Sequence, residues 1–276
     1  MSLVILGGLI VLLALGIEIA PAMGIVAGLG LILFVNQPMD YFARAAFDIM
    51  NSFTFTAIPL FVFMGTIYAT TGIVGGLFRG AEKIFGSLPG SLASAMILAN
   101  AIFGAISGSS LAAAATFGRI CFPEMEKAGY DPKMSLGAIA ISGTLSVLIP
   151  PSLIMIVYGG WQDVSVARLF AGGVVPGIIL TIFFVITVTI LVLSNPSLAP
   201  RAASRKFTLL EKLTAIWDIF PFLVVITMVL GTTFSGIMTP TESASLGAFL
   251  SIILALLFRQ MTYKALKESM LSLRAL

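Results

Sequence analysis

No histidine occurs in the 276 residues, and Cys121 is the only cysteine. These absences exclude histidine-based acid–base catalysis, imidazole metal sites, Cys-x-x-Cys redox chemistry and a disulfide within the chain. Charged residues are also scarce, at 10% of the chain, whereas soluble domains carry about 25%. The chain therefore lacks the residues needed to cover a water-facing surface, and it is too apolar to be disordered.

Hydrophobic residues make up 59% of the chain and give a mean hydropathy of +1.11. Apolar runs follow one another, which is typical of an all-α protein that crosses a membrane several times. The net charge is only +3, and in such a protein an excess of Lys and Arg mainly sets the topology. We therefore expect contact with a lipid bilayer and no binding of nucleic acid.

The first apolar run, Leu3–Val35, is too long for one straight span and contains Glu18 and Pro21, so it predicts two shorter helices or one broken helix. Met39–Met50 has apolar residues at helical spacing and charged residues on the opposite face, which predicts a helix along the membrane interface. Thr262–Arg274 has the same character. Further spans are expected at Thr54–Thr71, Leu169–Leu193, Ala215–Phe234 and Thr241–Phe258.

The distribution of basic residues predicts one re-entrant segment. Three loops are rich in Lys and Arg, at 79–83, 119–133 and 195–212. The positive-inside rule places all three on the cytoplasmic side. This holds only if Ile84–Gly118 enters and leaves the membrane on one face, as a hairpin with its tip at Ser107–Ser110. With that topology the N-terminus is periplasmic, and only Arg44 and Arg168 of the 15 basic residues lie outside.

The two amphipathic segments suggest an inverted repeat. Each follows a span that begins near a proline, Pro21 or Pro240, with a glycine seven residues on. Similar modules on opposite membrane faces are typical of inverted-topology repeats in secondary transporters. The predicted fold is therefore one full repeat and the start of a second. Its expected parts are scaffold helices 1–72 with an interfacial arm helix 38–50, a transport-domain half 73–194 with the hairpin 84–118 and a broken helix 134–159, and a second-repeat segment 195–276.

Two interruptions inside apolar segments carry the most chemical information. Ser107–Ser110 cannot comfortably continue a helix, and Gly143–Ser152 includes Pro150 and Pro151, which lack amide donors. Backbone freed from helical bonding in hydrocarbon is costly, so it persists only inside protein or beside a wet cavity. Freed carbonyls and hydroxyls suit a hard cation such as Na⁺, and the helix N-termini that follow suit an anion. The alternative is that these residues only kink helices or permit close packing.

Other polar residues have structural explanations that compete with functional ones. Asn100 and Thr116 flank the hairpin tip and either line a pocket or bond between helices. Thr239–Glu242 is typical of a capping box, and the alternative is a carboxylate in a coupling path. Asp218 either stays at the interface or is an intramembrane candidate. A serine nucleophile would need a Lys base, and every Lys falls in a loop or near an end, so we do not expect an enzyme.

Several motifs are similar to those of one transporter family, and they run in that family's order along nearly the whole chain. They are Ala57–Phe61 with Met64-Gly65, Ala105–Ala112, Pro123–Met125 with Gly129-Tyr130, Gly143, Ile149–Ser152, Tyr158-Gly159, Leu169-Phe170 with Gly173 and Pro176-Gly177, and Thr239–Glu242. The pattern resembles the large membrane subunit of TRAP transporters, the tripartite ATP-independent periplasmic transporters of bacteria and archaea.

The resemblance implies an elevator-type importer in the cytoplasmic membrane, coupled to Na⁺ and without another cofactor. A periplasmic binding protein delivers an organic acid in that family, and a small membrane subunit braces the scaffold. The first hairpin and the following broken helix hold Na⁺ there, largely through backbone carbonyls. Carried over to this sequence, the implied Na⁺ ligands are Ser107, Ser110, Gly143, Val147 and Pro150. Ser109 and Thr144 are their neighbours. Together with Asn100, these two are candidates to line the substrate pocket.

One departure from the family concerns length. Family members continue beyond the point that corresponds to Leu276, into a second hairpin and a second broken helix, so this chain is expected to hold half of a transport site. Two alternatives stay open. One is a divalent-anion/Na⁺ symporter of another family that works without a binding protein, and the other is a truncated scaffold that binds partners but transports nothing.

Overall fold

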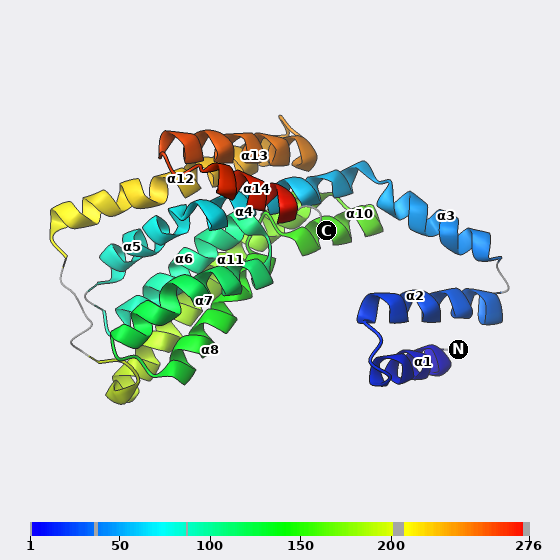
Figure 1. The fold of residues 1–276 in the computed structure, drawn as a ribbon, viewed down its shortest axis with the longest axis horizontal. Coiled ribbons are helices and arrows are strands. Elements are labelled where there is room, and N and C mark those ends of the chain that lie inside the picture. The colour runs from blue at the N-terminus through cyan, green and yellow to red at the C-terminus, as the bar shows by residue number, and fades with distance from the viewer. Residues whose placement is uncertain (1, 36–37, 87, 201–206, 273–276) are drawn as a thin grey trace. The chain divides into compact units, whose positions relative to one another are not determined.

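The structure is a computed structural model that describes residues 2–35, 38–86, 88–200 and 207–272. The chain divides into two compact units, residues 1–52 and 53–276, which are described separately. Within the described ranges every regular element is a helix (Figure 1). The all-α fold expected from the apolar runs is confirmed.

The first unit contains α1 (Ser2–Ala14), α2 (Ile19–Gly30), the π-helical turn η1 (Leu31–Val35) and α3 (Met39–Met50). The run Leu3–Val35 is therefore two helices, as expected. The chain leaves the first helix near Gly16, whose φ of 81° is a conformation that glycine adopts without strain. Pro21 lies in the first turn of α2, where proline is tolerated, so it does not cause the interruption.

The second unit contains the remaining helices. In chain order they are η2 (Phe53–Thr56), α4 (Ala57–Thr71), α5 (Ile73–Phe85), α6 (Ser91–Ser107), α7 (Ser110–Lys127), α8 (Pro132–Gly143), α9 (Leu145–Leu148), α10 (Leu153–Gln162), α11 (Val166–Ser194), η3 (Pro196–Leu198), α12 (Leu209–Phe234), α13 (Pro240–Leu257) and α14 (Tyr263–Ser272). Of the predicted basic and amphipathic segments, residues 201–206 and Arg274 lie outside the described residues.

Five helical segments in the described ranges are long and apolar enough to cross a membrane. They are Phe53–Thr71, Pro132–Gln162, Val166–Ser194, Leu210–Phe234 and Pro240–Leu257. Each of them falls on a span that the sequence predicts, the broken helix included. The protein is therefore a multi-pass membrane protein.

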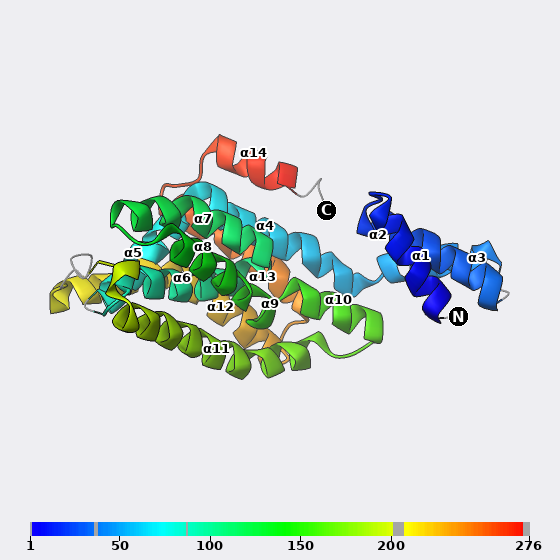
Figure 2. The same ribbon diagram turned by 90° about the horizontal axis from the view of Figure 1, so that it is seen from below.

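A helical hairpin is present, but it is shifted from the predicted range Ile84–Gly118, because Ile84 belongs to α5 and α6 begins at Ser91. α6 and α7 pack side by side (Figures 1 and 2), and α7 continues past Gly118 to Lys127. The charged residues after Gly118 suggest a loop, but Cys121 and Met125 between them are fully buried, so this stretch is an amphipathic helical end. Entry and exit of the hairpin on one membrane face stays a prediction.

The broken helix consists of α8, α9 and α10. α8 ends at Gly143, α9 is a single turn, and the non-helical residues 149–152 separate it from α10. The interruption falls where Gly143–Ser152 predicts it. Its cause is local, because Pro150 and Pro151 lack the N–H groups that would continue the helix.

α4 is a central element of the second unit and packs against α13, α14 and α6. Its side chains Met64 and Tyr68 are fully buried, and the Tyr68 hydroxyl donates to the carbonyl of Pro221 in α12 at 3.0 Å. The closest approach is at Gly65, where a Cβ atom would lie 2.7 Å from the Cα of Ser107. α4 thus supports the last residue of α6, next to the hairpin tip.

A second close contact joins α5 to α12. A Cβ atom at Gly80 would lie 3.0 Å from the Cβ of Asp218. Near this contact the ammonium of Lys83 donates to the Asp218 carboxylate at 2.6 Å and to the Thr214 hydroxyl at 3.2 Å. Because Asp218 has this ion-pair partner, its structural explanation is favoured over a role as an intramembrane carboxylate.

The contact at Gly65 generates a stability prediction. Gly65→Ala places a methyl group against the backbone of Ser107, so we expect the free energy of unfolding in detergent to fall by about 1–3 kcal/mol. Gly118→Ala is the matched control, because a Cβ atom there meets nothing within 4 Å and alanine is the better helix former. Chemical or thermal unfolding followed by circular dichroism measures both. Equal stability of the two variants would contradict the contact.

Candidate functional site

The tip of the hairpin meets the interruption of the broken helix. The backbone N–H of Leu153, the first residue of α10, donates to the carbonyl of Gly108 at 3.3 Å. Gly108 has a φ of 60°, and a Cβ atom there would lie 2.9 Å from the carbonyl oxygen of Pro151. Two segments that are far apart in the sequence are therefore in backbone contact, as the two interruptions predict.

Close contacts between backbones surround this meeting point. A Cβ atom at Gly104 in α6 would lie 2.8 Å from the Cα of Ser146 in α9. A Cβ atom at Gly143, the end of α8, would lie 3.1 Å from the carbonyl oxygen of Ser110 at the start of α7. We call the region formed by residues 104–110 and 143–153 the junction. It brings together the ends of α6, α7, α8, α9 and α10.

The helix ends give the junction two kinds of electrostatic surface. α6, α8 and α9 end there, and helix C-termini present carbonyl oxygens with partial negative charge. α7 and α10 begin there, and helix N-termini present N–H groups with partial positive charge. In a continuing helix the carbonyls of Ser146 and Val147 would bond to residues 150 and 151, but both are prolines without an N–H. The junction can therefore bind a cation through carbonyls and an anion through amides.

Unpaired oxygens of buried side chains mark the same region. The hydroxyls of Ser107, Ser146 and Ser152 in the junction are buried and have no hydrogen-bond partner, and the same holds for the Ser94 hydroxyl and the Asn100 amide oxygen earlier in α6. Buried polar atoms without a partner call for an explanation, and an ion or a water molecule is a common one. In the described part of the chain, no three His, Cys, Asp or Glu side chains gather to hold a metal ion. The donors at the junction are thus neutral oxygens, which suit a hard cation.

Three of the residues implied as Na⁺ ligands lie where α6, α7 and α8 meet. Ser107 ends α6, and Gly143 packs against the carbonyl of Ser110. The other two lie on the broken helix, with Val147 in α9 and Pro150 in the non-helical stretch after it. The structure places all five in the two segments that form the junction, and their binding of Na⁺ stays a prediction.

The candidates for the pocket lining differ in their surroundings. Ser109 is the N-cap of α7, and its side chain accepts from the N–H of Ala112 at 3.4 Å. Asn100 donates to the hydroxyl of Ser142 at 2.7 Å and so joins α6 to α8. Thr144 lies between α8 and α9 and is exposed, and its hydroxyl donates to the carbonyl of Ile141 in α8 at 2.6 Å. The hydroxyls of Ser109 and Thr144 thus have local backbone partners, whereas Asn100 links two helices.

Sequence reasoning did not single out four residues of the junction: Gly104, which lies outside the two predicted interruptions, and Gly108, Ser146 and Ser152, which lie inside them. A signal for the two glycines exists, because their four-residue spacing places small residues on one helix face where another backbone can approach. The serines carried no such signal, since their burial depends on how the broken helix packs. Thr239–Glu242 forms the expected capping box, in which the N–H of Thr239 donates to Glu242 at 2.7 Å. That geometry favours the cap over a coupling carboxylate.

Comparison with known proteins gives a consistent result. Residues 6–275 match the family model of the tripartite ATP-independent periplasmic transporter, DctM component. An uncharacterized protein YgiK of Salmonella typhimurium is 36% identical over 275 residues. The C4-dicarboxylate TRAP transporter large permease protein DctM of Pseudomonas aeruginosa is 34% identical over 237 residues. The sialic acid TRAP transporter permease protein SiaT of Haemophilus influenzae is 30% identical over 268 residues.

These matches cover most of this chain but a smaller share of the relatives. The match to YgiK covers 98% of this chain and 62% of the relative. For the Pseudomonas aeruginosa DctM the two shares are 85% and 54%, and for SiaT they are 89% and 43%. The chain thus spans about half the length of the curated relatives that it matches. The family model covers nearly all of the chain, with the hairpin and the broken helix inside the match. The chain therefore belongs to the DctM family, the large permease component of TRAP transporters.

Proposed function

We propose that this chain contributes one Na⁺ site and one side of a carboxylate pocket to a Na⁺-coupled TRAP importer of organic acids. The observation that carries the proposal is the junction, where freed carbonyls and unpaired buried hydroxyls meet within a multi-pass membrane protein. Such irregular backbone at membrane depth is tolerated only where it is buried or lines a cavity. In secondary transporters it is the usual place of ion and substrate sites.

The proposed Na⁺ ligands are the backbone carbonyls of Ser107, Ser110, Gly143, Val147 and Pro150. The unpaired hydroxyls of Ser107 and Ser146 are additional oxygen donors in the same region. A site made of neutral oxygens leaves the full charge of the ion uncompensated. The ion therefore attracts an anionic substrate bound next to it, which couples the binding of the two.

The N-termini of α7 and α10 are the proposed anion-binding elements. Both begin at the junction, and the extended residues Ser109 and Ser152 precede them. N–H groups and the helix dipole favour a carboxylate at this position. Two of the relatives are named for C4-dicarboxylates and sialic acid, which are carboxylic acids, and this supports an organic acid as the substrate class.

The energetics call for more than one Na⁺ ion. Each ion that enters down a tenfold gradient and a 100 mV potential releases about 3.7 kcal/mol, of which about 1.4 is chemical and about 2.3 electrical. Import of a dianion against the same potential costs about 4.6 kcal/mol. One ion is insufficient, and two ions cancel the charge and leave two chemical gradients to drive uptake. The junction supplies one site, so a second site elsewhere in the transporter is part of the proposal.

The proposal includes two partners and a membrane location. The family description names a tripartite periplasmic transporter, which supports a system of three components. The proposed partners are a small membrane subunit and a periplasmic substrate-binding protein. The proposed location is the cytoplasmic membrane of a bacterium or archaeon, with a periplasmic N-terminus and an elevator-type movement of the transport domain. The basic segments support this orientation through the positive-inside rule, although residues 79–83 lie in α5 and residues 119–127 in α7 rather than in loops.

Stability in different salts tests the Na⁺ site directly. We expect NaCl, compared with equal KCl, to raise the free energy of unfolding of the purified chain by about 1–3 kcal/mol when Na⁺ exceeds its dissociation constant about ten- to hundredfold. Gly143→Val should abolish the difference, because its side chain enters the space beside the Ser110 carbonyl. Gly137→Ala on the same helix should retain it, since a Cβ atom there meets nothing within 4 Å. Identical curves in NaCl and KCl for the unmodified chain would refute the site.

Transport is tested in a chimera. Residues of this chain replace the matching 237-residue region of the Pseudomonas aeruginosa DctM, which is reconstituted with its own small subunit and binding protein. We expect uptake of a C4-dicarboxylate that requires Na⁺ and falls by at least about tenfold in Gly143→Val, the equivalent of a loss of about 1.4 kcal/mol. Gly137→Ala serves again as the control. Uptake that proceeds equally in KCl would contradict Na⁺ coupling, and a folded chimera without uptake would favour the scaffold alternative.

A further inference from the structure

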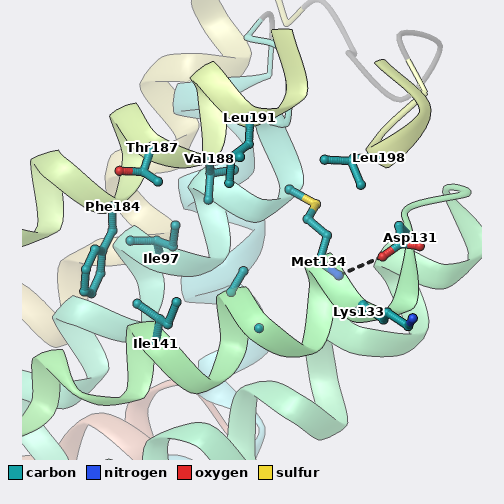
Figure 3. A pocket seen from close by; sticks show the side chains of 12 residues that line it. Ile97, Asp131, Lys133, Met134, Ile141, Phe184, Thr187, Val188, Leu191 and Leu198 are labelled. Carbon is teal, nitrogen blue, oxygen red and sulfur yellow. Dashed lines mark hydrogen bonds between the residues drawn. The ribbon is translucent and has the colours of Figure 1, made fainter. Parts of the chain in front are cut away.

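A cavity of about 630 Å³ lies between α6, α8 and α11, outside the junction (Figure 3). Five residues of α8 and four of α11 line it. The lining comprises Lys133, Met134, Gly137, Ala138 and Ile141 of α8, Phe184, Thr187, Val188 and Leu191 of α11, and Ile97, Asp131 and Leu198. The junction-facing residues of α8, Ser142 and Gly143, are not among them. The cavity is thus a separate feature of the transport-domain half.

The interior of the cavity is apolar. Its one hydroxyl, that of Thr187, donates to the carbonyl of Phe183 in its own helix at 2.7 Å, so it offers no free donor. The space is open next to Gly137, where a Cβ atom would meet nothing within 4 Å. The volume lies within the range of about 300–1,000 Å³ that is typical of small-molecule sites. Such an interior fits a hydrocarbon chain.

One end of the cavity is charged. Lys133 and Asp131 lie there, at the start of α8, and Phe184 and Ile141 lie toward the other end (Figure 3). The Asp131 carboxylate caps α8 by accepting from the N–H of Met134 at 2.9 Å. Lys133 makes no ion pair with an acidic residue in the described part of the chain. Its ammonium, beside a helix N-terminus, is therefore available to an anion.

The charged end and the apolar interior match the two parts of a membrane lipid. α8 and α11 belong to segments that are long and apolar enough to span a membrane, and Lys133 stands at the very start of the first of them. Basic pockets between transmembrane helices bind anionic lipid headgroups near the interface. We propose that the cavity binds an anionic phospholipid, with an acyl chain along α8 and α11 and its phosphate paired with Lys133. This proposal is independent of the Na⁺ site.

Native mass spectrometry of the purified full chain tests the proposal, with phosphatidylglycerol and phosphatidylcholine of identical acyl chains as probes. We expect a one-to-one adduct that forms preferentially with phosphatidylglycerol. Lys133→Gln should weaken this adduct about fivefold, the effect of one basic residue near an anionic headgroup. Gly137→Leu should weaken both lipid adducts by at least about tenfold, because the new side chain takes the place of acyl methylenes. Inorganic phosphate should not compete, since it lacks the acyl chain.

Gly118→Leu on α7 is the matched control, because its Cβ atom also meets nothing within 4 Å and it lies outside the cavity. It should bind lipid as the unmodified chain does. Thr187→Phe is a second variant that fills the cavity from α11, and it keeps the test decisive if Gly137→Leu does not fold. Equal lipid binding by the filled variants and the control, or loss of binding in all of them, would overturn the proposal. Competition by inorganic phosphate would overturn the lipid as the occupant.

Discussion

The structure depends on one constraint, namely that a backbone interrupted at membrane depth must find other partners for its polar groups. The hairpin tip and the broken helix supply such partners to each other, since the N–H of Leu153 donates a hydrogen bond to the carbonyl of Gly108. Neither interruption is tolerable alone, because each leaves helix-end carbonyls and amides in an apolar surrounding. The two segments have to fold against each other, so the position of the hairpin follows from the position of the prolines.

Small residues make this pairing possible. At Gly65 and Gly104 a side chain would collide with a neighbouring main chain or hydroxyl, and at Gly143 a Cβ atom would be in tight contact with the carbonyl of Ser110. In hydrocarbon, helices gain little from burying apolar groups, so close van der Waals contact and interhelical hydrogen bonds hold them together. The bonds from Tyr68 to Pro221 and from Asn100 to Ser142 are such interhelical links. The large side chains then fill the space around α4.

The sequence predicts the elements well because hydrophobic length and proline act locally. The spans, the two interruptions and the capping box at Thr239 all follow from such local signals. The end of the hairpin does not, because burial of Cys121 and Met125 against other helices overrides the charged residues between them. The same holds within the site. The break itself is readable from Pro150 and Pro151, whereas the burial of Ser146 and the local bond of Thr144 depend on tertiary packing.

The junction is built from main-chain atoms, and this has a consequence for how it tolerates genetic change. A substitution replaces a side chain but leaves the carbonyl at that position in place. The carbonyls of Val147 and Ser110, which we propose as Na⁺ ligands, therefore survive most exchanges of residue type. A mutation can instead change the course of the main chain through the junction. It does so at residues that bend the main chain or that leave room for a neighbouring backbone. The vulnerable positions are thus the prolines and glycines, although none of them carries a reactive group.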